Sequence, residues 1–448
     1  MELLEEFSTG LHPSNLRYLF YLVTPNETYH EKVEDIPNYT DVTTKWMIIL
    51  VLLEFLFSAK ENFALSDTVT SVNAGILSMM FKFGGKTLSV YVYPILYERF
   101  HFIELDAKSS STWMLCLFTQ DLVYYLAHRA VHEFGVFWSF HQMHHSSEYY
   151  NLSTALRQGC IQDIGTCVFD LAQSFFMPPN IFVAHRYLNV AVQFWLHTEF
   201  VPYLGPLEYF INTPSSHRVH HGRNAYCIDR NYGGALIIWD RLFGTYTRER
   251  DDEEIAYGLV TNINTFDQLY AQFFEFKELG YDKPNMKDAE GKDLFPGFWN
   301  KVKTVFAPPG YFPGTKTKKF LFWRCVEDSE EGIPPIEYPV VRHHNQLTLP
   351  LRVYLTFRWI LFMGVALDFN KHRAEMDWGT FLLSWVMILA YVQMFGYYFD
   401  KRNFAFFFDA TTTCILLFFS FTFTTSTCTL LCTFSLILIF TLRATNNL

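Results

Sequence analysis

Long apolar runs dominate both ends of the chain. They fall at residues 46–59, within 72–97, at 111–127, 181–200, 353–369, 378–398 and 404–442. A helix needs about 20 apolar residues to cross a bilayer, and several of these runs approach that length. Others are shorter or carry an acid such as Glu54 or Asp121, so the pattern leaves their ends open. The pattern predicts an all-α fold, a polytopic membrane helical bundle.

The polar stretches between these runs divide the chain into parts. Most of the proline, glycine and charge falls between about 202 and 350, which is typical of polypeptide outside the bilayer. The expected parts are a lumenal segment at 1–45, N-terminal transmembrane helices at 46–110, a histidine-rich catalytic domain at 111–265, a cytosolic loop region at 266–350 and C-terminal transmembrane helices at 351–448.

The orientation in the membrane follows from the first residues. "MELLEEF" lacks the basic start and apolar core of a cleavable signal peptide, so the first apolar run is expected to insert as an anchor. The glycosylation motifs at Asn26 and Asn38 precede it and would then be lumenal. Successive crossings place the histidine-rich segment, with Asn151, in the cytosol. We therefore expect a multi-pass protein of the endoplasmic reticulum membrane whose active site faces the cytosol.

Composition and charge narrow the class of protein. The chain is 50% hydrophobic and 19% aromatic, with a formal net charge of −10. This composition argues against an average soluble domain, and the negative charge argues against a nucleic-acid partner. The eight cysteines include no C-x-x-C pair, which favours buried thiols over zinc ligands. No obligate protein partner is inferred.

Histidine spacing carries the main chemical signal. Three motifs contribute eight rings: His128 and His132; His141, His144 and His145 in "HQMHH"; and His217, His220 and His221 in "HRVHH". Residues three or four apart share a helix face, so the spacing suggests that His141 and His144 act together while His145 turns towards a second ion, with the same division in "HRVHH". One ion uses about four ligands, so eight imidazoles predict two metals.

The identity of the metal is not set by spacing. Neutral imidazole suits zinc, copper, iron and nickel. An all-imidazole shell favours a strongly electrophilic oxidant after oxygen binds, as attack on an unactivated carbon–hydrogen bond requires. His197, in "QFWLHTE", is either a ninth ligand or a partner of a ligand. His343 and His344 are expected to lie outside the site.

These motifs resemble a known family. HxxxH, HxxHH and HxxHH, in this order, form the signature of the fatty acid hydroxylase and sterol desaturase superfamily of membrane di-iron enzymes. The flanking sequences, among them "HQMHHSSEYYNLSTALRQ" at 141–158 and "NTPSSHRVHHGRNAYCIDRNYGG" at 212–234, are similar to its tetrahydrobiopterin-dependent, ether-lipid-cleaving members. The resemblance is dense over about 110–265 and thinner towards both ends. Ser216 departs from it, because relatives have a histidine there.

The resemblance implies a function. The eight motif histidines would bind two iron ions on the cytosolic side, and Glu133 would matter for activity. Dioxygen would be the co-substrate and tetrahydrobiopterin the source of electrons. The substrate would be an ether lipid, an alkylglycerol or a lyso-alkylglycerophospholipid, hydroxylated at the alkyl carbon next to the ether oxygen. The hemiacetal formed would break down to a fatty aldehyde and a glycerol derivative.

Residue-level alternatives stay open beside this resemblance. Glu133 is equally well read as a carboxylate at a helix end, and Asp121 and Glu199 could hold a ligand ring, orient the pterin or face the bundle interior. Aromatic residues of the apolar runs would supply a groove for the alkyl chain: Phe55, Phe57, Tyr124, Tyr125, Phe137, Trp138 and Trp195.

Two other functions fit parts of the pattern. A sterol or fatty-acid hydroxylase would share the metal site but take its electrons through cytochrome b5. A histidine-rich metal transporter would line a path across the bilayer, whereas these motifs are expected to converge at one surface. No glycine-rich dinucleotide motif follows a predicted strand, so a bound nicotinamide is not expected.

Overall fold

The described part of the chain is all-helical. The computed structural model describes residues 10–82, 88–313, 333–423 and 426–445. Within these ranges α-helices and short 3-10 or π turns are joined by loops, and the only β-structure is a few isolated bridges. The predicted all-α class is confirmed. Two described helices, Leu349–His372 and Trp378–Phe399, are long and apolar enough to cross a membrane.

The longer helices coincide with the apolar runs, and shorter helices and turns lie between them. The α-helices are α2 (Pro25–Thr28), α3 (Tyr39–Phe57), α4 (Leu65–Phe81), α5 (Leu88–Phe100), α6 (Ser110–Glu133), α7 (Gly135–His145), α8 (Gln162–Leu171), α9 (Pro179–Val192), α10 (Pro214–His221), α11 (Ile238–Phe243), α12 (Gln268–Lys277), α13 (Phe298–Phe306), α14 (Leu349–His372), α15 (Trp378–Phe399), α16 (Ala405–Phe423) and α17 (Ser426–Ala444). The shorter turns are η1 (Pro13–Phe20), η2 (Val33–Asp35), η3 (Lys60–Asn62), η4 (Leu152–Leu156), η5 (Ala172–Phe175), η6 (Gln193–Leu196), η7 (Gly205–Tyr209), η8 (Ala225–Cys227), η9 (Glu278–Asp282) and η10 (Lys283–Asn285).

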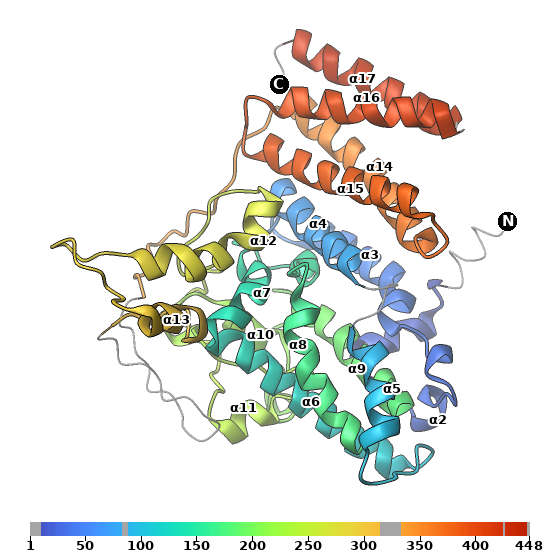
Figure 1. Ribbon diagram of the computed structural model, residues 1–448, viewed down its shortest axis with the longest axis vertical. Helices are drawn as coiled ribbons and strands as arrows, with labels where there is room; N and C mark the ends of the chain where they lie inside the picture. The colour runs from blue at the N-terminus through green and yellow to red at the C-terminus, as the bar shows by residue number, and fades with distance from the viewer. Residues whose placement is uncertain (1–9, 83–87, 314–332, 424–425, 446–448) are drawn as a thin grey trace.

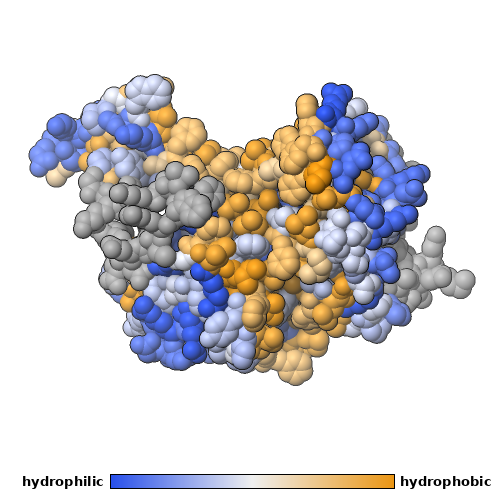
Figure 2. Space-filling view, turned by 90° about the horizontal axis from the view of Figure 1, so that it is seen from below, coloured by the Kyte–Doolittle hydropathy of each residue, from blue (hydrophilic) through white to orange (hydrophobic). Residues whose placement is uncertain are grey.

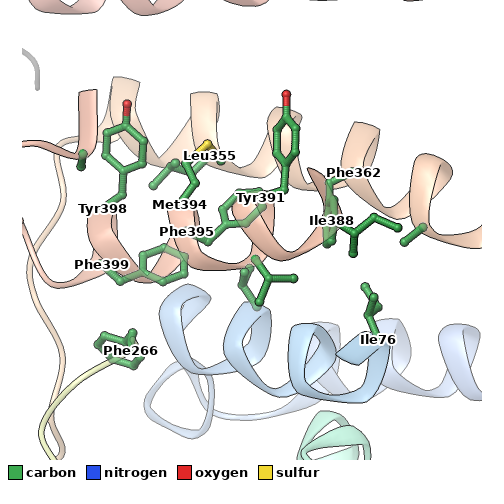
Figure 3. Close-up of a cluster of buried hydrophobic side chains, with 14 of the residues drawn as sticks. Ile76, Phe266, Leu355, Phe362, Ile388, Tyr391, Met394, Phe395, Tyr398 and Phe399 are labelled. Atoms are coloured by element: carbon green, nitrogen blue, oxygen red, sulfur yellow. The ribbon is translucent and has the colours of Figure 1, made fainter. Parts of the chain in front are cut away.

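Helices α14–α17 form a layer at one end of the molecule (Figure 1). α4 lies beneath this layer and packs against α14 and α15. In Figure 3, Ile76 of α4 faces Ile388 of α15, and Phe266 lies beside Phe399. Gly396 makes the approach possible, since a Cβ there would lie 2.3 Å from the carbonyl oxygen of Phe266. This contact ties the C-terminal layer to the segment that leads into α12.

A buried ion pair holds the C-terminal layer together. Arg358 of α14 lies 2.7 Å from Asp409 of α16, and both side chains are buried. Tyr354 donates a second hydrogen bond to the same carboxylate at 2.6 Å. Charges buried in an apolar bundle are costly unless paired, so this pair fixes α14 against α16.

A sharp break between α6 and α7 brings the first two histidine motifs together. α6 ends at Glu133, and extended Phe134 is the only residue before α7 begins. Gly135 starts α7 in a crowded place, where a Cβ would lie 2.8 Å from the carbonyl oxygen of Val305. The chain can therefore fold back at once, and α6 and α7 pack against each other.

An extended segment, residues 333–348, leads into α14. Tyr338 donates to the carbonyl oxygen of Glu254 at 2.6 Å, and Arg342 donates to that of Glu61 at 2.6 Å. The backbone N–H of His343 donates to Glu148 at 3.0 Å. We call residues 333–348 the linker strap, because these contacts tie the catalytic region to the C-terminal helices.

An apolar band crosses the face opposite the C-terminal layer. Figure 2 shows it between two hydrophilic flanks. Exposed apolar side chains of α5, α6, α8 and η5 include Phe100, Met114, Leu115, Phe118, Ile164, Val168 and Phe175. Large exposed apolar areas mark a contact with a partner or a membrane.

Candidate metal centre

Nine histidines converge into two buried groups. The five-histidine group contains His128, His132, His141, His145 and His220; the four-histidine group contains His144, His197, His217 and His221. Within each group the ligand atoms lie within 4.8 Å of one another. They come from α6, α7, α10 and the residue after η6. The sequence-based expectation that the three motifs meet at one place is confirmed.

The division within each HxxHH motif differs from the one expected. His141 shares a group with His145, and His217 shares one with His221. Their middle partners, His144 and His220, point into the opposite groups. The expected pairs, His141 with His144 and His217 with His220, were therefore wrong. Residues four apart lie about 40° apart around a helix, and residues three apart about 60°, so four-residue spacing gives the closer pair.

The ring atoms that face inwards are free for a ligand. The Nε2 atoms of His132, His145, His220 and His221 are buried and have no hydrogen-bond partner in the described structure. His128 and His141 place their Nε2 atoms 3.2 Å apart. Unpartnered buried nitrogens that converge in this way are costly without a bound cation. The residues present therefore fit a pair of metal ions.

The outward-facing nitrogens are held by the protein. Five rings place Nδ1 close to an oxygen: His128 to the Tyr232 carbonyl at 2.8 Å, His144 to the Arg157 carbonyl at 2.9 Å, His197 to the Gln193 carbonyl at 2.9 Å, His220 to the Arg230 carbonyl at 2.9 Å, and His141 to Gln162 Oε1 at 3.1 Å. An Nδ1–H that donates outwards leaves the Nε2 lone pair for a metal.

Burial keeps these imidazoles neutral. It lowers the pKa of all nine rings, and neighbouring imidazoles lower the pKa of most of them further. For His144 the pKa falls to about 4, first through burial and then through the nearby Arg157 cation. Only a neutral imidazole has a lone pair to donate, so the electrostatics also suit metal binding.

Two buried carboxylates position the loop that orients His128. Asp240 accepts from the backbone N–H groups of Tyr232 and Gly233 at 2.8 and 2.7 Å. Asp121 accepts from those of Ala235 and Leu236 at 2.8 and 3.1 Å. Asp121 contacts no histidine ring directly. It holds instead the loop that contains Tyr232, whose carbonyl oxygen accepts a hydrogen bond from His128 Nδ1.

A buried ion pair positions His144 in the same indirect way. Arg157, whose carbonyl accepts from His144, lies 2.6 Å from Asp67 of α4, and both side chains are 5% exposed. The same guanidinium donates to Ser71 and Ser146 at 3.0 Å. Asp67 was missed by sequence reasoning, because it lies 77 residues before His144 in a run without any motif.

Acidic residues singled out from the sequence lie at the edge of the groups. Glu133 pairs with Arg129 at 2.8 Å and is 19% exposed. Glu199 accepts from Asn62 at 2.6 Å. Neither carboxylate belongs to the histidine groups. Ser216, the position that departs from the superfamily pattern, is buried near them, and its hydroxyl has no hydrogen-bond partner in the described structure.

Aromatic rings close the site. Tyr150 stacks on Tyr257 with ring centroids 4.8 Å apart and lies 5.3 Å from the His221 ring. Trp138 lies 5.2 Å from His132 on the side of the five-histidine group. Such rings exclude water and strengthen electrostatic interactions inside the site.

Comparisons with known proteins agree with this geometry. The family model for fatty acid hydroxylase matches residues 113–245, which contain all nine histidines. Alkylglycerol monooxygenase of Caenorhabditis elegans is 44% identical over 396 residues, covering 88% of this chain and 78% of that protein. The enzymes of Xenopus tropicalis and Homo sapiens are 38% and 36% identical, each covering 86% of this chain and 83% of their own length. No solved structure matches. With this identity over most of both chains, the protein belongs to the alkylglycerol monooxygenase family.

Proposed function

We propose that the chain is a membrane di-iron monooxygenase that cleaves ether lipids with the help of tetrahydrobiopterin. It hydroxylates the alkyl carbon next to the ether oxygen of an alkylglycerol or lyso-alkylglycerophospholipid. The resulting hemiacetal breaks down to a fatty aldehyde and a glycerol derivative. The observation that carries the proposal is the pair of buried histidine groups within a chain of this family.

Iron bound in the two groups would supply the activation of dioxygen. The chain contributes the rest. Backbone carbonyls of Tyr232, Arg157 and Arg230 hold three rings by Nδ1 and leave Nε2 facing inwards. Trp138 and Tyr150 shield the rings from water. The histidine rings are thereby held in place before the substrate arrives, so little reorganisation is needed during the reaction.

His197 is assigned here as a ninth ligand. Its Nε2 lies 3.1 Å from that of His217 and 3.3 Å from that of His144, and its Nδ1 bonds to the Gln193 carbonyl oxygen. Without it the four-histidine group would have only three rings. For Glu133 we propose a positioning role. Its support is the ion pair with Arg129, one turn earlier on α6, which also donates to Tyr125 at 3.3 Å.

The proposed setting is a multi-pass protein of the endoplasmic reticulum membrane with its site towards the cytosol. A polar pterin arrives from water and an ether lipid from the bilayer, and an interfacial site meets both. Two apolar helices of spanning length and the exposed apolar band support a membrane location. The compact histidine groups favour an enzyme over a transporter, whose ligands would line a path.

A direct test combines activity with metal content. Detergent-purified protein should cleave an alkylglycerol with tetrahydrobiopterin and hold about two irons per chain. Activity with reduced cytochrome b5 but not with pterin would instead identify another lipid oxidase of the superfamily. Replacing His197 by alanine should lower iron towards about one per chain. His344→Ala, a change outside both groups, is the matched control and should keep both irons.

A further inference from the structure

An apolar groove opens between the end of α3, the start of α4 and the first half of α14. Its volume is about 540 Å³, within the range of roughly 300–1,000 Å³ that small-molecule sites occupy. Phe55 and Phe63 form part of one wall, edge to face with ring centroids 5.4 Å apart. Phe357 of α14 lines the other wall. The groove therefore offers hydrocarbon-lined space next to the catalytic region.

One positive charge lies on this apolar surface. Arg352 is the only charged residue among those lining the groove, and the other polar ones are the threonines Thr68 and Thr356. The Arg352 side chain is exposed, and its guanidinium has no ion-pair or hydrogen-bond partner in the described part of the chain. A guanidinium is a bidentate donor that suits phosphate. The groove thus complements a molecule with a phosphate at one end and a hydrocarbon chain at the other.

The charge lies at the end of α14 that faces the catalytic region. Arg352 is in the first turn of α14, directly after the linker strap that bonds to Glu61 and Glu148. Phe357 follows about 7.5 Å further along the helix axis. A lipid with its phosphate on Arg352 would therefore extend its chain away from the aqueous end of α14 and towards the middle of this helix.

Residues next to the groove wall in the chain are hydrogen-bonded to the segment that follows His197. Glu54, the residue before Phe55, accepts from the hydroxyl of Thr198 at 2.5 Å. Asn62, the residue before Phe63, donates to Glu199 at 2.6 Å. Thr198 and Glu199 directly follow His197. Phe55 and Phe63 therefore each follow a residue that is hydrogen-bonded to the segment after His197.

We propose that this groove binds the phosphate-bearing ether lipid substrate, with Arg352 on the phosphate and the alkyl chain against Phe55, Phe63 and Phe357. The assignment rests on the proposed function, and it adds a specificity determinant to it. Arg352 contributes to binding only when the head group carries a phosphate. It therefore favours lyso-alkylglycerophospholipids over uncharged alkylglycerols of the same chain length.

The test compares two substrates that differ only in head group. Arg352→Gln should raise KM for a 1-alkyl-lysophosphocholine about fivefold, the loss expected for one partly exposed charge-assisted contact, and leave KM for the matching 1-alkylglycerol unchanged. Arg352→Lys should recover most of the loss. Arg99→Gln, at an exposed arginine of α5 outside the groove, is the matched control and should change neither value.

A binding measurement makes the groove testable without catalysis. The fraction of a nitroxide-labelled alkyl-lysophosphocholine immobilised by the purified protein should fall in Arg352→Gln and in Thr356→Trp, which fills the groove. Equal KM changes for both substrates, or none for either, would overturn the assignment. Loss of immobilised lipid with unchanged KM would identify a structural phospholipid instead. If the wild type cleaves neither substrate, the proposed function fails, while the nitroxide measurement still decides whether the groove binds this lipid.

Discussion

Replacing Asp67 by asparagine should remove one metal more readily than the other. The change leaves the Arg157 guanidinium buried without its counter-charge, although Arg157 can keep its hydrogen bonds to Ser71 and Ser146. The Arg157 carbonyl orients His144, a member of the four-histidine group. The five-histidine group takes no hydrogen bond from Arg157. The four-histidine group should therefore lose its metal ion first.

The expected size of the effect follows from burial. Both side chains are 5% exposed and lie 2.6 Å apart, so solvent screens the pair weakly. Breaking such a pair by removing one partner costs about 3–5 kcal/mol of unfolding free energy. Loosening a residue that orients a metal ligand lowers metal affinity by roughly 10- to 100-fold. Iron content should therefore fall towards about one per chain at limiting iron, while the protein remains folded at low temperature.

Iron analysis of detergent-purified protein, combined with Mössbauer spectroscopy to separate the two sites, would measure this. The matched control is Asp170→Asn, which breaks the ion pair of buried Asp170 with partly buried Arg186 at 2.9 Å and involves no residue of the histidine groups. It should lower stability without changing the ratio of the two irons. Equal loss of both irons in Asp67→Asn, or full retention at the wild-type affinity, would refute the argument that Arg157 transmits the effect to His144.

Three further predictions concern residues outside the two groups. Burial raises the pKa of Glu275 to about 7, so the folded protein is most stable below about pH 4.5 with respect to this group and loses stability as pH rises through 7. Glu275→Gln should therefore increase the free energy of unfolding by up to about 3 kcal/mol at pH 8 and by little at pH 5, as measured by denaturant unfolding at both pH values. His343→Ala should reduce stability, because this ring stacks on Phe266 at 5.2 Å, whereas His344→Ala should not; thermal unfolding separates them, and equal Tm values would contradict it. In microsomes, glycosidase treatment should shift the wild type but not the double variant Asn26→Gln/Asn38→Gln, and a shift that survives both changes would contradict a lumenal N-terminus as the only glycosylated part.

Asn151, in the glycosylation motif "NLS", cannot report which side of the membrane the folded protein faces. Its side chain is 1% exposed and donates to the carbonyl oxygen of Asn62 at 2.9 Å. A folded protein would therefore leave this asparagine unmodified on either side of the membrane. Exposed Asn26 is the informative position, because a sugar there reports which side of the membrane the N-terminus occupies.

The sequence predicted that the histidine motifs converge because helical spacing is a local property. HxxxH and HxxHH place rings on one face wherever the helix lies, so their convergence could be expected from the motifs alone. The division into groups of five and four could not. It depends on how α7 folds back at Gly135 and on where α10 packs, and these contacts involve residues distant in sequence.

The supporting residues were beyond sequence reasoning for the same physical reason. Asp67 and Asp240 act through backbone groups of other residues, so no side-chain motif marks them. Phe55 could be proposed for an alkyl-chain groove from its aromatic character, and it lines an apolar groove. Arg352 could not, because its role depends on the approach of α14 to α4, which the apolar pattern of either helix leaves open.

The linker strap limits how this protein can be divided. It is tempting to end the chain before the linker strap and to express the catalytic region without the strap and the C-terminal helices. Such a fragment would lose the hydrogen bonds of Tyr338 with Asn224 and Glu254. It would also lose those from Arg342 to Glu61 and from the His343 backbone to Glu148. Glu148 lies three residues after His145, so the cut would be felt at the end of α7. The linker strap therefore belongs to the same folding unit as the catalytic region, and a shortened protein for biochemistry should retain at least residues 333–348.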